Sequence, residues 1–478
     1  MINTKNITFQ NESDIMLKTK IFIIGSLGLY FGWMLAFPFY GPIYSVAFSD
    51  DSLFIMPMVM VFMIAHTMTY IVFGICLRQT SIWFKMMIIG LAATLMSSLL
   101  LVFNHPWLGF ISMLIMGIAS AVFILGWSVV FSFVGEKESH LKIMASTIVL
   151  ANLVVLVFFI MRPLITINNY LILSMTPLIL TAFLIKIASS SHVMWVESVN
   201  VMSKVPKHLL LIFFLFIFNI YLNGGFMYTV MLPSLRYKGF FAPYYPYLLY
   251  MLVLTILYVF NQRISNILIA YLGIALLGLA FISFALLNES IYGYIMTIGL
   301  MEAAFALLDL FLWTSLGLLV SKYGKPYLFF GILLAANTTS IIVGHLISDN
   351  ISNIENNRYL VVALLSAASI FLAVIVIPWL MRIINASHSP PFKLNAESIY
   401  RQRYAQLITH LPQDMHLTQR ESEVVMLVLK GLTNKDIANE LFISEHTIKT
   451  HLKKIHGKFG VSRKKDLIYL ASNEKSKP

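Results

Sequence analysis

The sequence predicts an all-α protein in which a polytopic helical membrane bundle precedes a small four-helix domain. Hydrophobic residues make up 59% of the 478 residues and charged residues only 11%, whereas roughly 25% of residues are charged in a soluble protein. Long apolar runs fill most of the chain, but the last sixty residues are polar and helix-periodic. The net charge is +7 from Arg382 onward (16 basic, 9 acidic) and +5 before it (17 basic, 12 acidic).

Twelve apolar runs are long enough to cross a bilayer, whose hydrocarbon core of ~30 Å takes about 20 helical residues. They cover residues 21–47, 53–77, 82–103, 107–134, 143–161, 168–187, 208–232, 244–261, 264–287, 291–320, 326–348 and 359–381. The longest internal polar stretch, Ala188 to Lys207, separates the sixth run from the seventh. The sequence therefore predicts about 12 spans in a 6+6 arrangement over residues 21–382.

Lys and Arg are distributed unevenly between alternate loops. If residues 1–20 are cytoplasmic, thirteen basic residues fall on the cytoplasmic side before the tail, and four (Arg162, Arg236, Lys238 and Arg358) fall on the other. Basic residues concentrate in cytoplasmic loops. We therefore expect a multi-pass protein of the bacterial cytoplasmic (inner) membrane, with the lipid bilayer as partner. Both the N-terminal segment and the C-terminal domain are expected in the cytoplasm.

The six-plus-six layout resembles the major facilitator superfamily, whose halves are repeats related by an axis along the membrane normal. A weak internal similarity supports this, because Arg78 and Arg263 lie in short cytoplasmic turns at matching places in the two halves. In that family the first of these loops usually carries an Asp-Arg and glycine-rich gating signature. Here Gly74, Arg78 and Lys85 fit the pattern, but the Asp position is not acidic. The resemblance implies a major-facilitator-like fold, and the departure argues against active transport.

Ionisable side chains inside the spans are candidate functional residues, because each costs roughly 2.5–3.5 kcal/mol at the bilayer centre. Glu302 and Asp309 are seven residues apart in the tenth span, which puts both on one helix face. Either they bind a cationic ligand or a proton in a central cavity, or they are buried hydrogen-bond partners between helices. His66 in the second span and His345 in the eleventh are further candidates for ligand or proton sensing.

Residues 383–415 form a linker between the membrane bundle and the last domain. The segment from Ser387 to Pro391 cannot continue a helix, because proline lacks the backbone donor. A short amphipathic helix follows, with one apolar stripe made of Tyr400, Tyr404, Leu407, Ile408 and Leu411. This helix either serves dimerisation or signalling or, as we favour, packs on the domain that follows.

Residues 416–473 predict four short helices, followed by a tail at 474–478. Thr418-Gln419-Arg420-Glu421 is a capping box, and Gly431 ends the helix that it starts. Thr433 or Asn434 caps the second helix, Ser444 caps a third helix from Glu445 to about Phe459, and the fourth runs from Ser462 to about Asn473. The third helix carries Lys and Thr on the face opposite its apolar residues, which suits the major groove of DNA.

This segment resembles the DNA-binding helix-turn-helix domain of LuxR-type regulators, which runs LTxRExEV, then GLxNKxIAxxLxIS, then TxKxHLxxIxxK. The resemblance implies that the third helix enters the major groove of double-stranded DNA and that the domain binds as a homodimer through its last helix. It places Lys449, Thr450 and Lys453 at base edges, with Lys454 on the same cationic face, and it places Ser444, Thr447, Lys435, Lys458, Arg463 and Lys464 at phosphates. Glu421 takes a structural role. The alternative is a basic tail on anionic lipid.

No nucleophile-base pair, phosphate loop, HExxH or CxxC motif occurs, so we expect no enzyme activity, cofactor or metal site. The sequence predicts a membrane-embedded one-component transcriptional regulator, whose transporter-like bundle senses a small molecule or a membrane signal and controls DNA binding. One alternative is an active secondary transporter with a fused DNA-binding reporter domain. The other is a bundle that serves only as an anchor.

Overall fold

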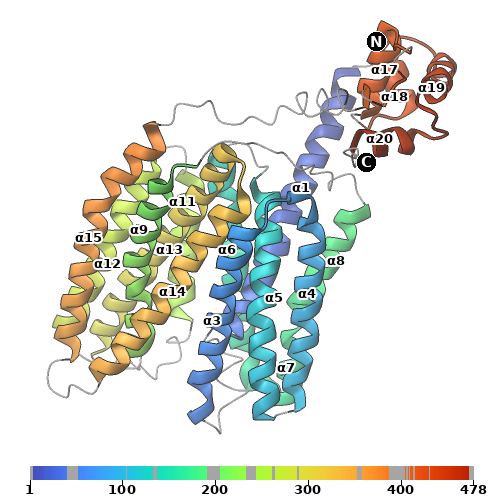
Figure 1. Cartoon of the computed structure of the whole chain (residues 1–478). Helices are drawn as coiled ribbons and strands as arrows, with labels where there is room; N and C mark the ends of the chain where they lie inside the picture. Colours follow the sequence, from blue (N-terminus) through green and yellow to red (C-terminus); the bar gives the residue numbers. More distant parts are fainter. Residues whose placement is uncertain are drawn as a thin grey trace. The chain divides into compact units, whose positions relative to one another are not determined.

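The chain divides into two compact units, Met1–Phe392 and Lys393–Pro478, each with its own hydrophobic core. The computed structural model describes residues 4–39, 52–103, 105–132, 137–190, 205–232, 244–260, 264–287, 290–352, 358–386, 404, 407–408, 410–412, 415–429 and 431–472. Within these ranges the secondary structure is helical and contains no strand, which confirms the predicted all-α class (Figure 1).

The first unit consists of two sets of helices. The first set is α1 (Thr4–Ala36), α3 (Ser52–Cys76), α4 (Trp83–Leu100), α5 (Pro106–Ser132), α6 (Lys137–Met161), α7 (Ile167–Ser174) and α8 (Thr176–Ser190). The second is α9 (Lys207–Phe226) with a π-helical turn η5 (Met227–Met231), α11 (Tyr245–Phe260), α12 (Asn266–Leu286), α13 (Ile291–Tyr323), α14 (Pro326–Ser352) and α15 (Arg358–Ala386). Short 3-10 turns η1 (Thr80–Ile82), η2 (Leu101–Phe103) and η3 (Arg162–Leu164) flank α4 and follow α6.

Eleven helical segments of the described chain are long and apolar enough to cross a membrane. The remaining predicted span, 244–261, corresponds to α11, an apolar helix of 16 residues. The bundle of about twelve spans is therefore confirmed. Residues 288–289, between the ninth and tenth predicted spans, and most of the polar stretch between the sixth and seventh spans lie outside the described residues.

The two sets of helices repeat one packing pattern. In the first set α1 packs on α6 and α8, and α5 packs on α3 and α4; in the second set α9 packs on α14 and α15, and α13 packs on α11 and α12. The contacts between the sets also correspond, since α3 packs on α14 and α11 packs on α6. Figure 1 shows α9 to α15 grouped beside α1 to α8, with α3 and α14 adjacent. The two halves are thus structural repeats.

Helix α13 runs through the interior of the bundle. Ser290 caps its start by accepting a hydrogen bond from the Gly293 amide at 3.0 Å, and Gly324, with φ +66°, ends it. Of its most apolar segment 83% is buried, compared with 28% for α15. A helix this buried contacts protein on nearly all sides, so Glu302 and Asp309 lie at the centre of the bundle.

The crossing of α3 and α14 depends on two glycines. A Cβ on Gly331 would lie 2.5 Å from the Tyr70 carbonyl oxygen and 2.6 Å from the Gly74 Cα, and both of these are backbone atoms. The hydroxyl groups of Thr67 and Thr338 share a hydrogen bond of 2.6 Å further along the same crossing. Because glycine has no side chain, the two backbones can approach this closely.

The second unit contains α17 (Gln419–Leu429), α18 (Asn434–Glu440), α19 (Glu445–Phe459) and α20 (Lys464–Ser472). The predicted capping box is confirmed, since the Thr418 amide donates to Glu421 Oε2 at 2.8 Å and the Glu421 amide to Thr418 Oγ1 at 3.2 Å. Thr433, not Asn434, caps α18, and Ser444 caps α19. The fourth helix begins at Lys464, two residues later than predicted.

The part of the linker that the structure describes packs on this second core. Leu407 is fully buried there, with Ile408 and Leu411 partly buried beside it. The Tyr404 hydroxyl donates a hydrogen bond of 2.7 Å to Ser422 Oγ. The favoured packing role of this segment is therefore confirmed, whereas Tyr400 and the prolines at 390–391 lie outside the described residues.

The α3–α14 crossing generates a stability prediction. Gly331→Ala places a methyl group against backbone atoms that cannot rotate away, so it should destabilise the membrane unit by about 1–3 kcal/mol. Tryptophan fluorescence during thermal unfolding of the detergent-solubilised protein measures this effect. Gly278→Ala is the matched control, because its nearest neighbour would lie 3.9 Å away. Equal unfolding midpoints for the two variants would contradict the crossing.

Candidate functional site

The exposed face of α19 is the first candidate site. Ile448, Leu452, Ile455 and Phe459 are buried in the second core, and at 100° per residue the opposite face passes through positions 446, 450, 453, 454 and 457. Thr450, Lys453 and Lys454 are exposed on that face. Lys449 lies at its edge, 64% exposed, and pairs with Glu445 at 3.4 Å. An exposed ion pair of this kind contributes little energy, so Lys449 remains available to a partner.

Ser444 and Thr447 lie together at the start of α19. Their hydroxyl oxygens are 2.8 Å apart, and Ser444 Oγ accepts a hydrogen bond from the Thr447 amide at 3.1 Å. Amide groups at a helix start attract anions, so this end of α19 suits a phosphate. Lys435 is exposed on α18, and Arg463 is 80% exposed in a weak pair with Asp466 at 3.5 Å.

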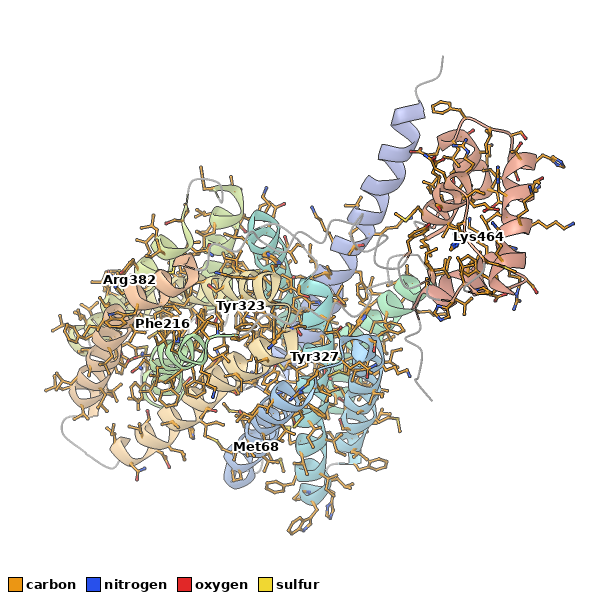
Figure 2. The ribbon with its side chains drawn as sticks, turned by 45° about the horizontal axis from the view of Figure 1, so that its top comes forward. Met68, Phe216, Tyr323, Tyr327, Arg382 and Lys464 are labelled. Atoms are coloured by element: carbon orange, nitrogen blue, oxygen red, sulfur yellow. The ribbon has the colours of Figure 1, made fainter. Side chains whose placement is uncertain are left out.

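Two of the predicted phosphate-binding lysines have partners inside the domain. Lys458 Nζ donates to Glu421 Oε2 at 2.7 Å and to the His416 carbonyl at 2.8 Å. Lys464 Nζ donates to the Leu432 carbonyl, and burial lowers the pKa of Lys464. Figure 2 shows Lys464 among the helices of this unit. Both lysines hold the fold together, so a phosphate role for either has to compete with these contacts.

Glu421 joins the start of α17 to the end of α19. Its side chain is 4% exposed, and it accepts hydrogen bonds from Lys458 and from the Thr418 amide. Burial by itself would raise the pKa of this carboxyl, but the hydrogen bonds from Lys458 and Thr418 outweigh burial and lower it. The carboxylate is therefore ionised in the folded domain, in the structural role that the sequence predicts.

His446 belongs to the exposed face of α19, although it is not among the predicted contacts. Its carbonyl accepts a hydrogen bond of 3.1 Å from Thr450 Oγ1, one helical turn later. Its side chain is exposed next to the start of the helix. Counting helix positions from Thr450 back to 446 would have found it, because i and i+4 share a face.

A cavity of about 500 Å³ in the membrane unit is the second candidate site. It is lined by α1, α3, α5 and α6 of the first half and by α9, η5, α11, α13 and α14 of the second. Glu302, Asp309 and His66 line it, whereas His345 does not. The structure thus brings three of the four predicted sensing residues to one cavity at the interface between the halves.

The two carboxylates of α13 have different surroundings. Asp309 accepts hydrogen bonds of 2.5 Å from both the Tyr221 hydroxyl of α9 and the Tyr250 hydroxyl of α11, one on each carboxylate oxygen. Glu302 lies about 10.5 Å away along the helix, given a rise of 1.5 Å per residue. In the part of the chain that the structure describes, the Glu302 carboxylate accepts no hydrogen bond. Tyr247 and Tyr294 lie within electrostatic reach of it and line the same cavity.

The two histidines differ as well. His66 Nδ1 lies 3.1 Å from the Gly117 carbonyl and 2.8 Å from Ser120 Oγ, so it ties α3 to α5 while its ring borders the cavity. The His66 ring also packs edge-on to Tyr70, with centroids 4.4 Å apart. His345 lies at the close approach of α9 and α14, where its amide would meet a Cβ on Gly225 at 2.5 Å.

Aromatic rings from both halves cluster around Trp313 at the wall of the cavity. Trp313 borders the cavity, and its ring centroid lies 6.1 Å from Phe31, 6.1 Å from Trp127 and 5.8 Å from Phe330. Phe31 and Trp127 belong to the first half, and Trp313 and Phe330 to the second. A ligand resting on Trp313 would therefore contact a cluster that both halves share.

Neither Tyr221 nor Tyr250 stands out in the sequence as a site residue. The tyrosine-rich segment from Tyr244 to Tyr250 is a possible signal, since Tyr247 and Tyr250 share one face of α11. Among the described residues no group of three or more His, Cys, Asp and Glu side chains is placed to hold a metal ion.

Comparison with known proteins identifies the C-terminal domain. Residues 415–471 match the luxR family of bacterial regulatory proteins (GerE), so this domain is a LuxR-type helix-turn-helix domain. An HTH-type transcriptional regulator of Mycobacterium bovis is 46% identical over 52 residues, which are 11% of this chain and 6% of that protein. The HTH-type transcriptional regulator MalT of Yersinia pestis is 39% identical over 70 residues, which are 14% of this chain and 8% of that protein. The match thus spans under a tenth of these relatives' length.

The membrane unit is similar to solved major facilitator structures. A bacterial homologue of the iron transporter ferroportin, in an outward-facing state, superposes with a TM-score of 0.54 over 77% of this chain and 99% of that one, at 12% identity. The major facilitator transporter FucP, in its outward conformation, superposes with a TM-score of 0.54 over 76% of this chain and 98% of that one, at 10% identity. The Escherichia coli fucose:proton symporter FucP superposes with a TM-score of 0.53 at 11% identity. At such low identities the likeness shows the fold alone. The chain is thus a membrane protein with a DNA-binding domain.

The Glu421 contacts predict how the stability of the isolated unit 393–478 depends on pH. The folded-state pKa of Glu421 lies below its ordinary value of 4.5, so its contribution is present above pH 4.5 and is lost as the pH falls through the folded value. Glu421→Gln should cost about 1–3 kcal/mol at pH 7 and flatten the stability profile below pH 4.5. Urea unfolding across pH tests this. Glu423→Gln, which removes a half-exposed surface pair, is the control, and equal losses would contradict the role of Glu421.

The α19 face predicts sequence-specific DNA binding by the same fragment. Lys449→Ala with Lys453→Ala should weaken binding to a duplex selected from a random library about a hundredfold or more, since each base contact contributes ~1–3 kcal/mol. Arg463→Ala should instead weaken all duplexes alike and reduce the salt slope by about 1. Titrations at several salt concentrations separate the two effects. Specific binding by the double variant would rule out α19 as the recognition helix.

Proposed function

We propose that this chain is a membrane-embedded one-component transcriptional regulator, in which a small molecule bound in the cavity controls DNA binding by the LuxR-type domain. The observation that carries the proposal is the combination in one polypeptide of that domain with a cavity lined by both halves of a bundle. The domain supports a double-stranded DNA partner. The cavity, with Glu302 and Asp309 in an otherwise largely apolar wall, supports ligand sensing rather than a role as an anchor.

The position of the cavity supplies a physical route for control. A ligand that contacts both halves binds one arrangement of them better than another, and this difference in affinity shifts the equilibrium between the two. The halves meet where α3 packs on α14 and where α6 packs on α11, so these crossings are the elements that a ligand would bias. We propose that the end of α15 transmits the change to the linker. The regulator acts by binding and release, without enzyme activity.

We propose a bacterial cytoplasmic membrane location with both termini in the cytoplasm, on the ground of the basic residues counted above. In this orientation Gly74 and Gly331 lie at the cytoplasmic ends of their helices, where the halves are in close contact. Phe39, Phe159 and Tyr294, which line the cavity, lie near the opposite ends. The ligand would then enter from outside. On DNA we propose a homodimer joined through α20.

A second candidate function is secondary transport with the DNA-binding domain as a reporter. The likeness of the bundle to the fold of major facilitator transporters favours it. The loop after α3 argues against it, because Leu77, Arg78 and Gln79 carry no acidic residue where that family usually has one. Uptake of a ligand into proteoliposomes containing the full chain distinguishes a transporter from a sensor.

The regulatory function predicts distinct effects of two double variants in cells. Crosslinking of the intact protein to DNA identifies its promoters, and a reporter on one of them is then followed against candidate effectors. Lys449→Ala with Lys453→Ala should abolish reporter control. Glu302→Gln with Asp309→Asn should leave DNA crosslinking intact but hold the output in one state, because the differential affinity for the ligand is lost.

Membrane protein level is measured for each variant, so that poor insertion is not mistaken for lost control. Asp349→Asn, an exposed acid on α14 that does not line the cavity, is the control for charge removal. If the reporter output depended only on the membrane protein level in every variant, the bundle would serve only as an anchor. If the reporter of the Glu302 and Asp309 double variant responded to the effector as the unmodified chain does, the cavity would not be the sensing site.

A further inference from the structure

The cavity has two carboxylates, but they do not have equivalent roles. Both oxygens of Asp309 already accept hydrogen bonds from the hydroxyls of Tyr221 and Tyr250. These bonds join α13 to α9 and to α11, so Asp309 acts as a clamp inside the second half. Glu302 borders the same cavity without a hydrogen bond from any described residue. Of the two, Glu302 is the group with unfilled acceptor capacity.

The described wall of the cavity supplies no Lys or Arg as a counter-ion for that carboxylate. Among the residues that the structure describes, its lining contains two acids, no Lys or Arg, and one histidine, His66, which is bonded through Nδ1 to the α5 side. An ionised carboxylate in a largely apolar wall is costly unless a cation pairs with it. The electrostatics of the site therefore favour a positively charged occupant over an anionic one.

The rest of the lining favours a bulky organic occupant over a small ion. Aromatic rings recur around the cavity, among them Phe31, Phe39, Phe159, Tyr247, Tyr294, Phe305 and Trp313. Such rings bury apolar surface and attract a cation to their faces. The neutral polar groups of the lining are the side chains of Asn152, Asn337 and Thr338 and the hydroxyls of its tyrosines, of which Tyr221 and Tyr250 are already bonded to Asp309. A volume of about 500 Å³ is in the range of ordinary ligand pockets.

We propose that the cavity binds a hydrophobic organic monocation, whose charged group pairs with Glu302 and whose apolar body rests on the aromatic rings toward Trp313. Asp309 holds its own helix α13 to α9 and α11 and does not serve as the counter-ion. This inference rests on the proposed sensing role of the cavity and adds the chemical class of the ligand. It also separates the roles of two residues that lie on one face of one helix.

The test uses two probe ions of one shape and opposite charge, tetraphenylphosphonium and tetraphenylborate. Equilibrium dialysis of the purified full-length protein in detergent, corrected for binding to protein-free micelles, should show saturable binding of the cation and none of the anion. Glu302→Gln should weaken cation binding about tenfold or more, as loss of a charged contact does. Asp349→Asn, the control outside the cavity, should bind as the unmodified chain does.

Tyr250→Phe separates the clamp from the counter-ion. It removes one hydrogen bond to Asp309, so it should lower the thermal midpoint and leave the cation affinity within about threefold, since the charge at Glu302 is untouched. Equal binding of the two probe ions overturns the proposal even if Glu302→Gln fails to fold. So does unaltered cation binding in Glu302→Gln. Dialysis contains no DNA, so its result is independent of the promoter assay, and failure of either proposal is recognised separately.

Discussion

The close crossing of α3 and α14 determines where the two halves of the bundle are in close contact and where a cavity remains between them. Lipid gives helices no hydrophobic reason to associate, so contacts between the halves depend on backbone approach and hydrogen bonds. Gly74 and Gly331 allow the approach, and the Thr67–Thr338 hydrogen bond adds a polar contact at the wall of the cavity. Space for a ligand remains beyond this crossing, where aromatic side chains from both halves surround it without filling it.

Helix α13 shows how neighbours give two similar residues different chemistry. Glu302 and Asp309 share one face, yet two tyrosines from other helices satisfy Asp309 while Glu302 borders open space. The same logic applies in the DNA-binding domain. Lys453 and Lys454 are exposed, whereas Lys458, one turn beyond Lys454, is partly buried and pairs with the buried carboxylate of Glu421. A charged residue is available to a ligand only where it is not already paired or hydrogen-bonded within the fold.

In the proposed function, the domain and the bundle meet different requirements. The LuxR-type domain has its own core, caps and exposed cationic helix face, which are the requirements for reading DNA. The bundle has a cavity shared by two repeats, which is the requirement for converting occupancy into a change of arrangement. Sensing by binding needs no catalytic group, and the cavity offers charge, rings and volume in place of one.

The sequence by itself determined the features that depend on local spacing. Apolar runs set the number of spans, and the caps at Thr418 and Ser444 follow from contacts three residues apart, so short patterns encode them. Only the tertiary structure decided which groups meet across the chain. Tyr221 and Tyr250 reach Asp309 over 88 and 59 positions, Lys464 turns inward to Leu432, and His66 borders the cavity while His345 does not. These contacts arise from the packing of helices that are distant in the sequence. The periodicity of one helix does not determine which other helix packs against it.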